Sequence, residues 1–168
     1  MLLLSCWGVV SSKLTHLHLY FHEVDAGAPN ATIVNVSSLH ILLRAWWLWL
    51  PRQAGARRRS PFGDVNVFDN ELREGPDPAS RLIGRAQGFA VNASLDGSSI
   101  LSAIDFVFSG STLTTQGQFD PAGGPSERSI VGGTGKLRFA RGYMTSRLLS
   151  STNTTIVVVF DMYFTLPH

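Results

Sequence analysis

Two stretches decide how this chain folds: SRLIGRAQGF at residues 80–89 and IVGGTGKLRFARGY at residues 130–143. Each combines a turn marked by glycine with a strand-like run that carries arginine among small and apolar residues. Runs of this kind between glycine-rich turns are typical of β-strands joined by short connections. The two stretches therefore predict an all-β protein.

Strand-like segments also fill most of the remaining sequence. Residues 16–24 alternate, so that Leu17, Leu19, Phe21 and Glu23 share one face of the expected strand. Residues 154–166 alternate as well, but both of their faces are largely apolar. Five further segments are rich in β-branched and aromatic residues, and they cover residues 62–68, 82–93, 99–109, 112–119 and 136–149.

This arrangement favours antiparallel strands in a closed barrel over an open sandwich. No segment of ten or more residues has a clean helical period, which leaves little room for crossover helices. Strands as long as residues 136–149 would leave exposed edges unless the sheet closed on itself. Because both faces of residues 154–166 are apolar, we also expect a partner subunit to cover the outside of that strand.

The composition predicts one domain of 168 residues with a local basic region. Five arginines fall within one short stretch, and the other nine basic residues are fewer than the twelve acidic ones. A nucleic-acid surface spread over the fold is therefore not expected. The arginine-rich stretch, residues 39–60, also holds three of the four tryptophans. We interpret it as an atypical loop insertion; the alternative is an amphipathic segment on a membrane surface, without stable insertion into the membrane.

Several features favour the secretory route. Residues 1–12 are mostly apolar and are interpreted as a leader or a truncated signal peptide, ahead of a single barrel domain at residues 13–168. Cys6 is the only cysteine, so no intramolecular disulfide can form. Four Asn-X-Ser/Thr sequons are candidate glycosylation sites, and they begin at Asn30, Asn35, Asn92 and Asn153.

No motif of a common hydrolase, metalloprotease or phosphate-binding loop is present. His16, His18 and His22 share one strand face and could bind zinc, but no carboxylate or cysteine lies beside them in the sequence. We interpret them as polar surface positions and expect neither a metal nor a cofactor. Glu23 has two interpretations: a carboxyl group in an apolar cavity with a raised pKa, or a solvated group at the strand end. Asp105 poses the same question.

Five blocks of the sequence, in order, resemble the plant dirigent protein family. LYFHEV at residues 19–24 resembles the opening strand, and VVVFDMYF at residues 157–164 the closing strand. Between them lie FGDVNVFDNELREGPDPASRLIGRAQG at residues 62–88, AIDFVFSGSTL at residues 103–113 and SIVGGTGKLRFARGY at residues 129–143. Residues 39–60 have no counterpart in this pattern, which supports the insertion hypothesis.

The resemblance implies an eight-stranded antiparallel barrel, shared with allene oxide cyclase, that assembles as a homotrimer and is secreted to the plant cell wall. It implies a protein without its own oxidative centre, which steers the coupling of monolignol radicals such as those of coniferyl alcohol. A separate laccase or peroxidase supplies these radicals in lignan biosynthesis. Two alternatives stay open: a non-catalytic barrel in defence or ligand binding, and an isomerase resembling allene oxide cyclase.

The resemblance also implies site residues. Glu23 takes the place of the family's pocket aspartate, Asp120 matches its second acid, and Arg128 lies near its pocket arginine, although a strict count from the glycine turn reaches Ser126. The expected substrate-binding wall consists of Phe21, Phe106, Phe108, Tyr143 and Phe160. The third block is shorter than usual before its turn, which predicts a missing pocket aromatic residue and altered pairing of the two strands.

Overall fold

The computed structural model describes residues 13–36, 62–122 and 124–166. The expected leader at residues 1–12 and the expected insertion at residues 39–60 lie outside the described residues. Within the described part of the chain, no helix is both long and apolar enough to cross a membrane.

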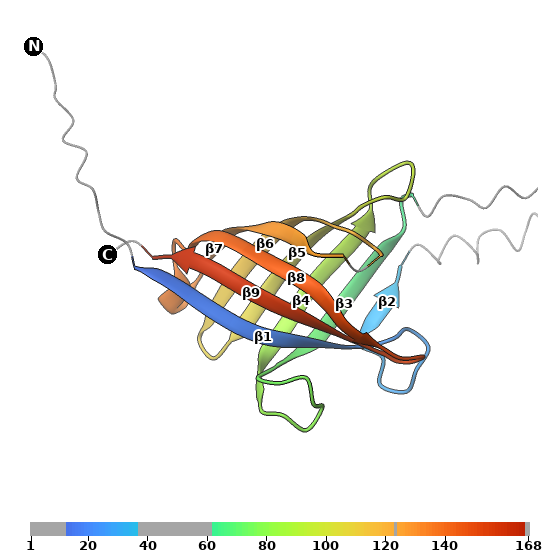
Figure 1. Cartoon of the computed structure of the whole chain (residues 1–168), viewed down its shortest axis with the longest axis horizontal. Coiled ribbons are helices and arrows are strands. Elements are labelled where there is room, and N and C mark those ends of the chain that lie inside the picture. The colour runs from blue at the N-terminus through green and yellow to red at the C-terminus, as the bar shows by residue number, and fades with distance from the viewer. Residues whose placement is uncertain (1–12, 37–61, 123, 167–168) are drawn as a thin grey trace, which may run out of the picture.

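The described chain forms one antiparallel β-sheet that closes into a barrel, with N- and C-terminal strands side by side (Figure 1). The prediction of a closed all-β barrel is confirmed. Its strands are β1 (Leu14–Val24), β2 (Ile33–Asn35), β3 (Val65–Arg73), β4 (Leu82–Asn92), β5 (Ile100–Phe108), β6 (Ser111–Phe119), β7 (Ser126–Gly133), β8 (Arg141–Ser151) and β9 (Thr155–Thr165). From β3 to β9 each strand pairs with the next, and β1 pairs with both β9 and β3. The barrel thus has eight strands, with β2 as one extra strand.

β1 and β2 share one edge of β3. β1 pairs with the second half of β3 through residues 20–22, and β2 pairs with its first half through residues 33–35. Residues 25–32 leave the wall between these two contacts, and the Asp69 amide N–H donates to the Thr32 carbonyl oxygen at 2.9 Å where the chain returns. The barrel wall is therefore split beside the end of β1.

The strands differ from the sequence prediction in four places: β2 was not predicted, β3 covers Val65–Arg73 instead of residues 62–68, and β7 and β8 also differ. β8 begins only at Arg141, because Gly135–Leu137 form a 3₁₀-helix where residues 136–140 were expected to be extended. β7 was not predicted, since Ser126–Gly133 (SERSIVGG) begins with polar and charged residues and ends in two glycines. The tight turn at Ser109 and Gly110 joins β5 to β6, and these two strands pair in continuous register.

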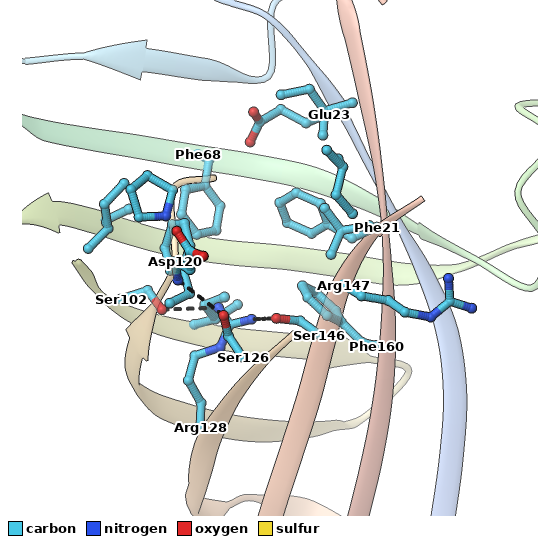
Figure 2. A pocket seen from close by; sticks show the side chains of 18 of the residues that line it. Phe21, Glu23, Phe68, Ser102, Asp120, Ser126, Arg128, Ser146, Arg147 and Phe160 are labelled. Carbon is cyan, nitrogen blue, oxygen red and sulfur yellow. Dashed lines mark hydrogen bonds between the residues drawn. The ribbon is translucent and has the colours of Figure 1, made fainter. Parts of the chain in front are cut away.

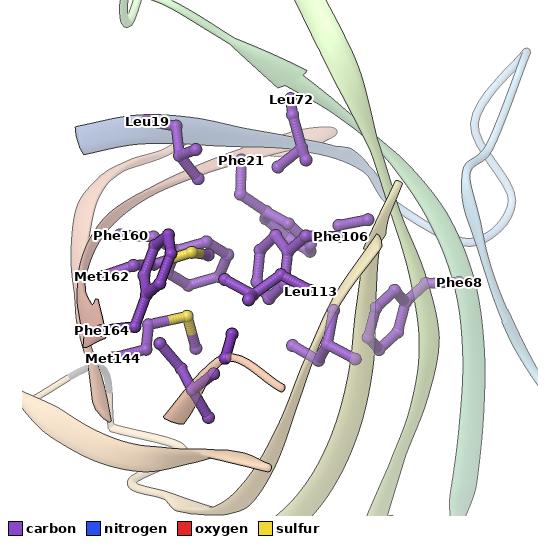
Figure 3. Close-up of a cluster of buried hydrophobic side chains, with 14 of the residues drawn as sticks. Leu19, Phe21, Phe68, Leu72, Phe106, Leu113, Met144, Phe160, Met162 and Phe164 are labelled. Carbon is purple, nitrogen blue, oxygen red and sulfur yellow. The ribbon is translucent and has the colours of Figure 1, made fainter. Parts of the chain in front are cut away.

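One end of the barrel is filled by apolar side chains (Figure 3). Its largest fully buried members include Leu19, Leu72, Phe106, Leu113, Ile130, Met144, Met162 and Phe164. Phe106 packs edge-on against Phe160, which also contacts Phe21, with ring centroids 5.4 and 5.3 Å apart. These aromatic rings close the packed end and form the floor of the space beyond it.

β4 presents only small residues to the barrel interior over most of its length. The inward positions are Gly84, Ala86, Gly88 and Ala90, and both alanines are buried. A Cβ atom on Gly88 would collide with the carbonyl oxygen of Ala103 on β5, so the two backbones approach closely there. Because β4 contributes so little side-chain volume, space remains inside the barrel.

The outer face of β9 is already covered within a single chain. Val157 and Val159 point outward, yet they are only 8% and 1% exposed. The cross-strand neighbours of Val159 are Tyr20 on β1 and Arg147 on β8, two long side chains that can shield it. The apolar outer positions of β9 therefore do not by themselves require a partner subunit.

Candidate functional site

A cavity of about 410 Å³ occupies the end of the barrel opposite the packed core (Figure 2). It lies where β1 and β6 end and where β5, β7 and β9 begin. Most of its wall is apolar, and this part includes Phe21, Ile33, Phe68, Ala90, Ile100, Ile104, Phe119, Ile156, Val158 and Phe160. Its size is in the usual range for pockets that bind small organic ligands.

Glu23 places a carboxyl group in this apolar wall. It is the last inward residue of β1, after Leu19 and Phe21. Burial raises the pKa of Glu23, and the nearby charge of Asp25 adds to the rise, while a hydrogen bond from Asn70 opposes it. The first interpretation of Glu23, as a carboxyl group held in a cavity, therefore agrees with the structure. A raised pKa keeps a larger fraction of the group protonated, which suits a proton donor.

Asn70 orients this carboxyl group across the split in the barrel wall. The Asn70 side chain is fully buried, and its Nδ2 donates to Glu23 Oε2 at 3.0 Å. Its Oδ1 accepts from the Thr32 hydroxyl group, whose oxygen in turn accepts from the Val24 amide at 2.9 Å. Where β1 stops pairing with β3, these hydrogen bonds pair the polar groups at the split. The same bonds hold the Glu23 carboxyl group in place.

Arg128 brings a buried positive charge to the same cavity. It is 5% exposed, its Nη1 donates to Ser102 Oγ at 3.2 Å, and its Nη2 donates to Ser146 Oγ. Its guanidinium carbon lies 5.3 Å from the ring centroid of Phe119 and 5.5 Å from that of Phe160. Among the described residues, no carboxylate pairs with Arg128 and its Nε has no hydrogen-bond partner.

This environment makes Arg128 a candidate site for an anionic or electron-rich ligand atom. Burial lowers the pKa of Arg128 to about 10, which leaves it charged at neutral pH. A buried cation without a counterion is costly unless other groups compensate for the lost hydration. Two neutral hydroxyl groups and two aromatic faces compensate in part. A phenolate or carbonyl oxygen in the cavity would complete this compensation.

Asp120 lies at the rim rather than inside the wall. It is exposed, follows β6, and accepts a hydrogen bond from the Ala122 amide at 2.7 Å through Oδ1. Its own amide donates to Ser126 Oγ at 3.1 Å, which fixes the turn into β7. The structure thus brings Glu23, Asp120 and Arg128 to one cavity, with Asp120 in the most solvated position (Figure 2).

The five expected wall residues divide into two groups. Phe21 and Phe160 line the cavity. Phe106 is fully buried in the packed end, and Phe108 is only packed against that core. Tyr143 points away from the interior, is 42% exposed and stacks on Tyr163. These three residues do not line the cavity, since sequence alternation gives the face of a strand but not the level along the barrel.

The polar groups that hold the charged side chains were not predicted from the sequence. Asn70, Ser102 and Ser146 are each at most 7% exposed. Asn70 stands between inward Phe68 and Leu72, so a polar residue in an apolar row was the signal that could have revealed it. The serines gave no such signal, because serine is common on either face of a strand.

Comparison with known proteins decides the family. A family model described as "Dirigent-like protein" matches residues 14–165. The chain belongs to the dirigent family. It is 31% identical to dirigent protein 1 of Arabidopsis thaliana over 161 residues, which cover 93% of this chain and 81% of that protein. It is 33% identical to pterocarpan synthase 1 of Glycyrrhiza echinata, with 93% and 80% of the two chains covered.

Solved dirigent structures agree with this barrel. The structure of a pterocarpan synthase dirigent protein superposes with a TM-score of 0.75 at 30% identity, covering 100% of this chain and 97% of that one. Pyocyanin demethylase, at 11% identity and a TM-score of 0.57, shares the fold alone. The dirigent barrel is thus found in proteins with different chemistry, and function must be argued from the cavity.

Proposed function

We propose that this dirigent protein binds phenolic phenylpropanoid intermediates in its cavity and fixes the stereochemistry of their coupling. The observation that carries the proposal is that one largely apolar cavity holds a half-buried acid, Glu23, and a buried cation, Arg128, that has no carboxylate partner among the described residues. Apolar walls suit planar aromatic rings, while the two polar groups suit phenol oxygens. The cavity supplies orientation, which is enough to select one product from a reactive intermediate.

The proposed substrates are monolignol radicals such as those of coniferyl alcohol, supplied by a separate laccase or peroxidase. Coupling joins one side-chain carbon of each phenoxy radical in a new bond, with one electron from each partner, and leaves two quinone methides. A hydroxyl group then adds to each quinone-methide carbon. Each addition releases one proton from the hydroxyl group and adds one proton to the ring oxygen, so this step needs no further reactant.

Glu23 and Arg128 have distinct parts in this second step. A protonated Glu23 can donate to the ring oxygen and recover a proton from the adding hydroxyl group. Arg128 can donate from its guanidinium group to an oxygen that becomes negative during the addition. Asp120 at the rim is a second acid that remains in contact with solvent. A cavity that opens at such a rim, with two acids, favours coupling over the alternative of a cyclase with a long closed tunnel and one acid.

A second candidate function is closure of a single quinone methide by a phenol within the same molecule. The similarity to pterocarpan synthases in both sequence and structure favours it. The same residues would serve, because ring closure also transfers one proton to a quinone-methide oxygen. The two candidates differ in whether one molecule or two enter the cavity.

The proposal includes a biological setting. The four sequons and the expected leader support secretion to the cell wall, where radical-forming oxidases would meet the protein. A homotrimer is part of the same proposal. Val67 on β3 and Phe89 on β4 support it, since they are opposed in register on the outer wall and are 42% and 44% exposed. Such paired apolar side chains suit a subunit interface.

The decisive experiment couples coniferyl alcohol with a laccase, with and without stoichiometric protein, and analyses the lignans by chiral chromatography. We expect an excess of one enantiomer with the protein and a racemic product without it. A parallel assay follows closure of a quinone methide that carries a tethered phenol. Racemic lignan together with accelerated closure would replace the first candidate by the second, and no effect in either assay would refute both.

Two variants with matched controls test the site itself. Glu23→Gln should slow the closure step by about 100-fold, the lower range for loss of a positioned acid. Arg128→Met keeps an apolar stem but removes the charge, and it should abolish the enantiomeric excess. The controls are Glu127→Gln and Arg138→Met, since both residues are exposed on the outside of the barrel. Equal losses in variants and controls would contradict the assignment.

A further inference from the structure

The outer wall of the barrel carries a second cluster of ligand-type side chains, separate from the cavity. His16 and His18 are outward residues of β1, and Asp161 is an outward residue of β9. Asp161 pairs directly with His18 in the strand register, while His16 stands one outward position along. The alternating residues of β1, Leu17 and Leu19, face the core, so the cluster and the cavity lie on opposite sides of the wall.

The three side chains already converge. His16 Nε2 lies 2.8 Å and His18 Nδ1 lies 2.7 Å from the same Asp161 Oδ1. One ligand atom from each residue lies within 4.8 Å of the other two. No carboxylate lies beside His16 or His18 in the sequence, because Asp161 is 143 residues away from His18 and reaches it only through strand pairing.

We propose that His16, His18 and Asp161 bind one Zn²⁺ ion on the outside of the barrel. Two imidazole nitrogens and a carboxylate oxygen are a common ligand set for zinc, with bonds of about 2.0–2.2 Å. In a tetrahedral site such bonds place ligand atoms about 3.4 Å apart. The observed separations of 2.7 and 2.8 Å therefore require only a small opening of the cluster around the ion.

The surroundings of the cluster resemble those of a metal site in two ways. The second ring nitrogen of His18, Nε2, is 3.1 Å from the Tyr20 hydroxyl group, so donation to that oxygen would leave Nδ1 free to bind the ion. The His16 ring stacks on Tyr163 at 4.4 Å between centroids and an interplanar angle of 3°, which fixes its orientation. Ligand orientation is thus largely set before an ion arrives.

The cluster is also accessible. The His16 and His18 side chains are 47% and 43% exposed, so an ion can enter from solution. Zn²⁺ would replace the hydrogen bonds between the two histidines and Asp161 by metal–ligand bonds that link β1 to β9.

Titration calorimetry of Zn²⁺ into protein without a histidine tag tests the proposal. We expect saturable binding of one ion per chain and a rise of Tm with added Zn²⁺. His18→Ala and Asp161→Asn should each abolish both effects. Tyr20→Phe keeps the ring but removes the hydroxyl partner of His18, and it should weaken binding by about tenfold, as is usual for outer partners of metal ligands.

His22→Gln is the matched control. His22 lies on the same outward face of β1 but contacts the Gly75 carbonyl oxygen at 3.0 Å instead of the cluster, so its loss should leave Zn²⁺ binding unchanged. Circular dichroism establishes that each variant is folded. The proposal is overturned if the folded native protein binds no Zn²⁺ saturably, or if binding survives both His18→Ala and Asp161→Asn.

Discussion

At the scale of single residues, the cavity depends on polar side chains that the barrel holds away from water. Glu23 has one direct side-chain donor, Asn70, and Arg128 has two serine hydroxyl groups as acceptors. Neither charged group meets an opposite charge within salt-bridge distance among the described residues. Such groups reduce the stability of the fold, which is expected where their reactivity is used.

Glu23→Gln should stabilise the protein at neutral pH. The folded-state pKa of Glu23 lies above its unfolded value of 4.5, so folding becomes less favourable as the pH rises from one value to the other. The glutamine side chain cannot ionise but can still accept the hydrogen bond from Asn70. Urea unfolding at a series of pH values should show an advantage of the variant that is absent in acid and grows toward neutral pH.

Asn70→Ala provides the opposite comparison. It removes the hydrogen bond that lowers the pKa of Glu23, so that pKa should rise further in an NMR titration. It also leaves buried polar groups unsatisfied, which costs about 1–3 kcal/mol. Glu23→Gln could instead be less stable than the native protein by the same amount at every pH. That result would contradict the loss of hydration that we assign to the buried Glu23 carboxyl group.

At the scale of strands, backbone contact shapes the cavity as much as side chains do. The stretch at residues 80–89 supplies most of β4, which continues to Asn92, and its two inward glycines allow β4 and β5 to approach each other. The stretch at residues 130–143 includes the end of β7 and the start of β8, joined by the 3₁₀-helix Gly135–Leu137. Gly142 is equally constrained, since its Cβ atom would collide with the Tyr163 carbonyl oxygen.

Gly88→Ala should therefore destabilise the barrel by about 1–3 kcal/mol, the usual range for overpacking. The added methyl group meets backbone atoms of Ala103 and Ile104, which cannot rotate away as a side chain can. Thermal or urea unfolding measures the loss. Gln87→Ala, one position earlier and exposed on the outer face, is the control and should stay within about 0.5 kcal/mol of the native protein.

Strand positions and faces could be predicted from the sequence, whereas positions along the barrel axis could not. Alternation grouped Glu23 with Leu19 and Phe21 on one face, which is the inward face in the structure. The family resemblance named Phe160 and Phe106 as wall residues, but only Phe160 lines the cavity, because Phe106 lies in the packed end. The level of a residue depends on the stagger between neighbouring strands, which no local pattern encodes. For the same reason the contacts Asn70 to Glu23 and Asp161 to His18 became visible only in the folded chain.

At the scale of the whole molecule, the barrel separates a reactive interior from an exterior that can meet other molecules. Phenolic ligands would enter at the rim near Asp120, while the opposite end is closed by core side chains. The outer wall carries the proposed zinc site and the apolar pair of Val67 and Phe89. Substitutions on the outer wall can therefore leave the cavity unchanged, and substitutions in the cavity can leave the outer wall unchanged.

If the protein passes through the secretory route, we expect glycans on Asn30 and Asn153. Asn30 lies in the exposed excursion between β1 and β2, and Asn153 in the exposed turn between β8 and β9. Asn92 is only 9% exposed, and Asn35 Nδ2 donates to Asn66 Oδ1 at 3.0 Å. Mass spectrometry of glycopeptides from protein expressed in plant leaves measures occupancy at each site. High occupancy at Asn92 would contradict its buried position.

The unequal pairing of β1 has a consequence for motion. β1 is joined to β9 by eleven residue pairs but to β3 by only three, and the split at residues 25–32 lies directly beyond those three. Local opening takes the path that breaks the fewest contacts. The barrel should therefore open locally by separation of β1 from β3. The three residue pairs between these strands would then set how long a bound ligand stays in the cavity.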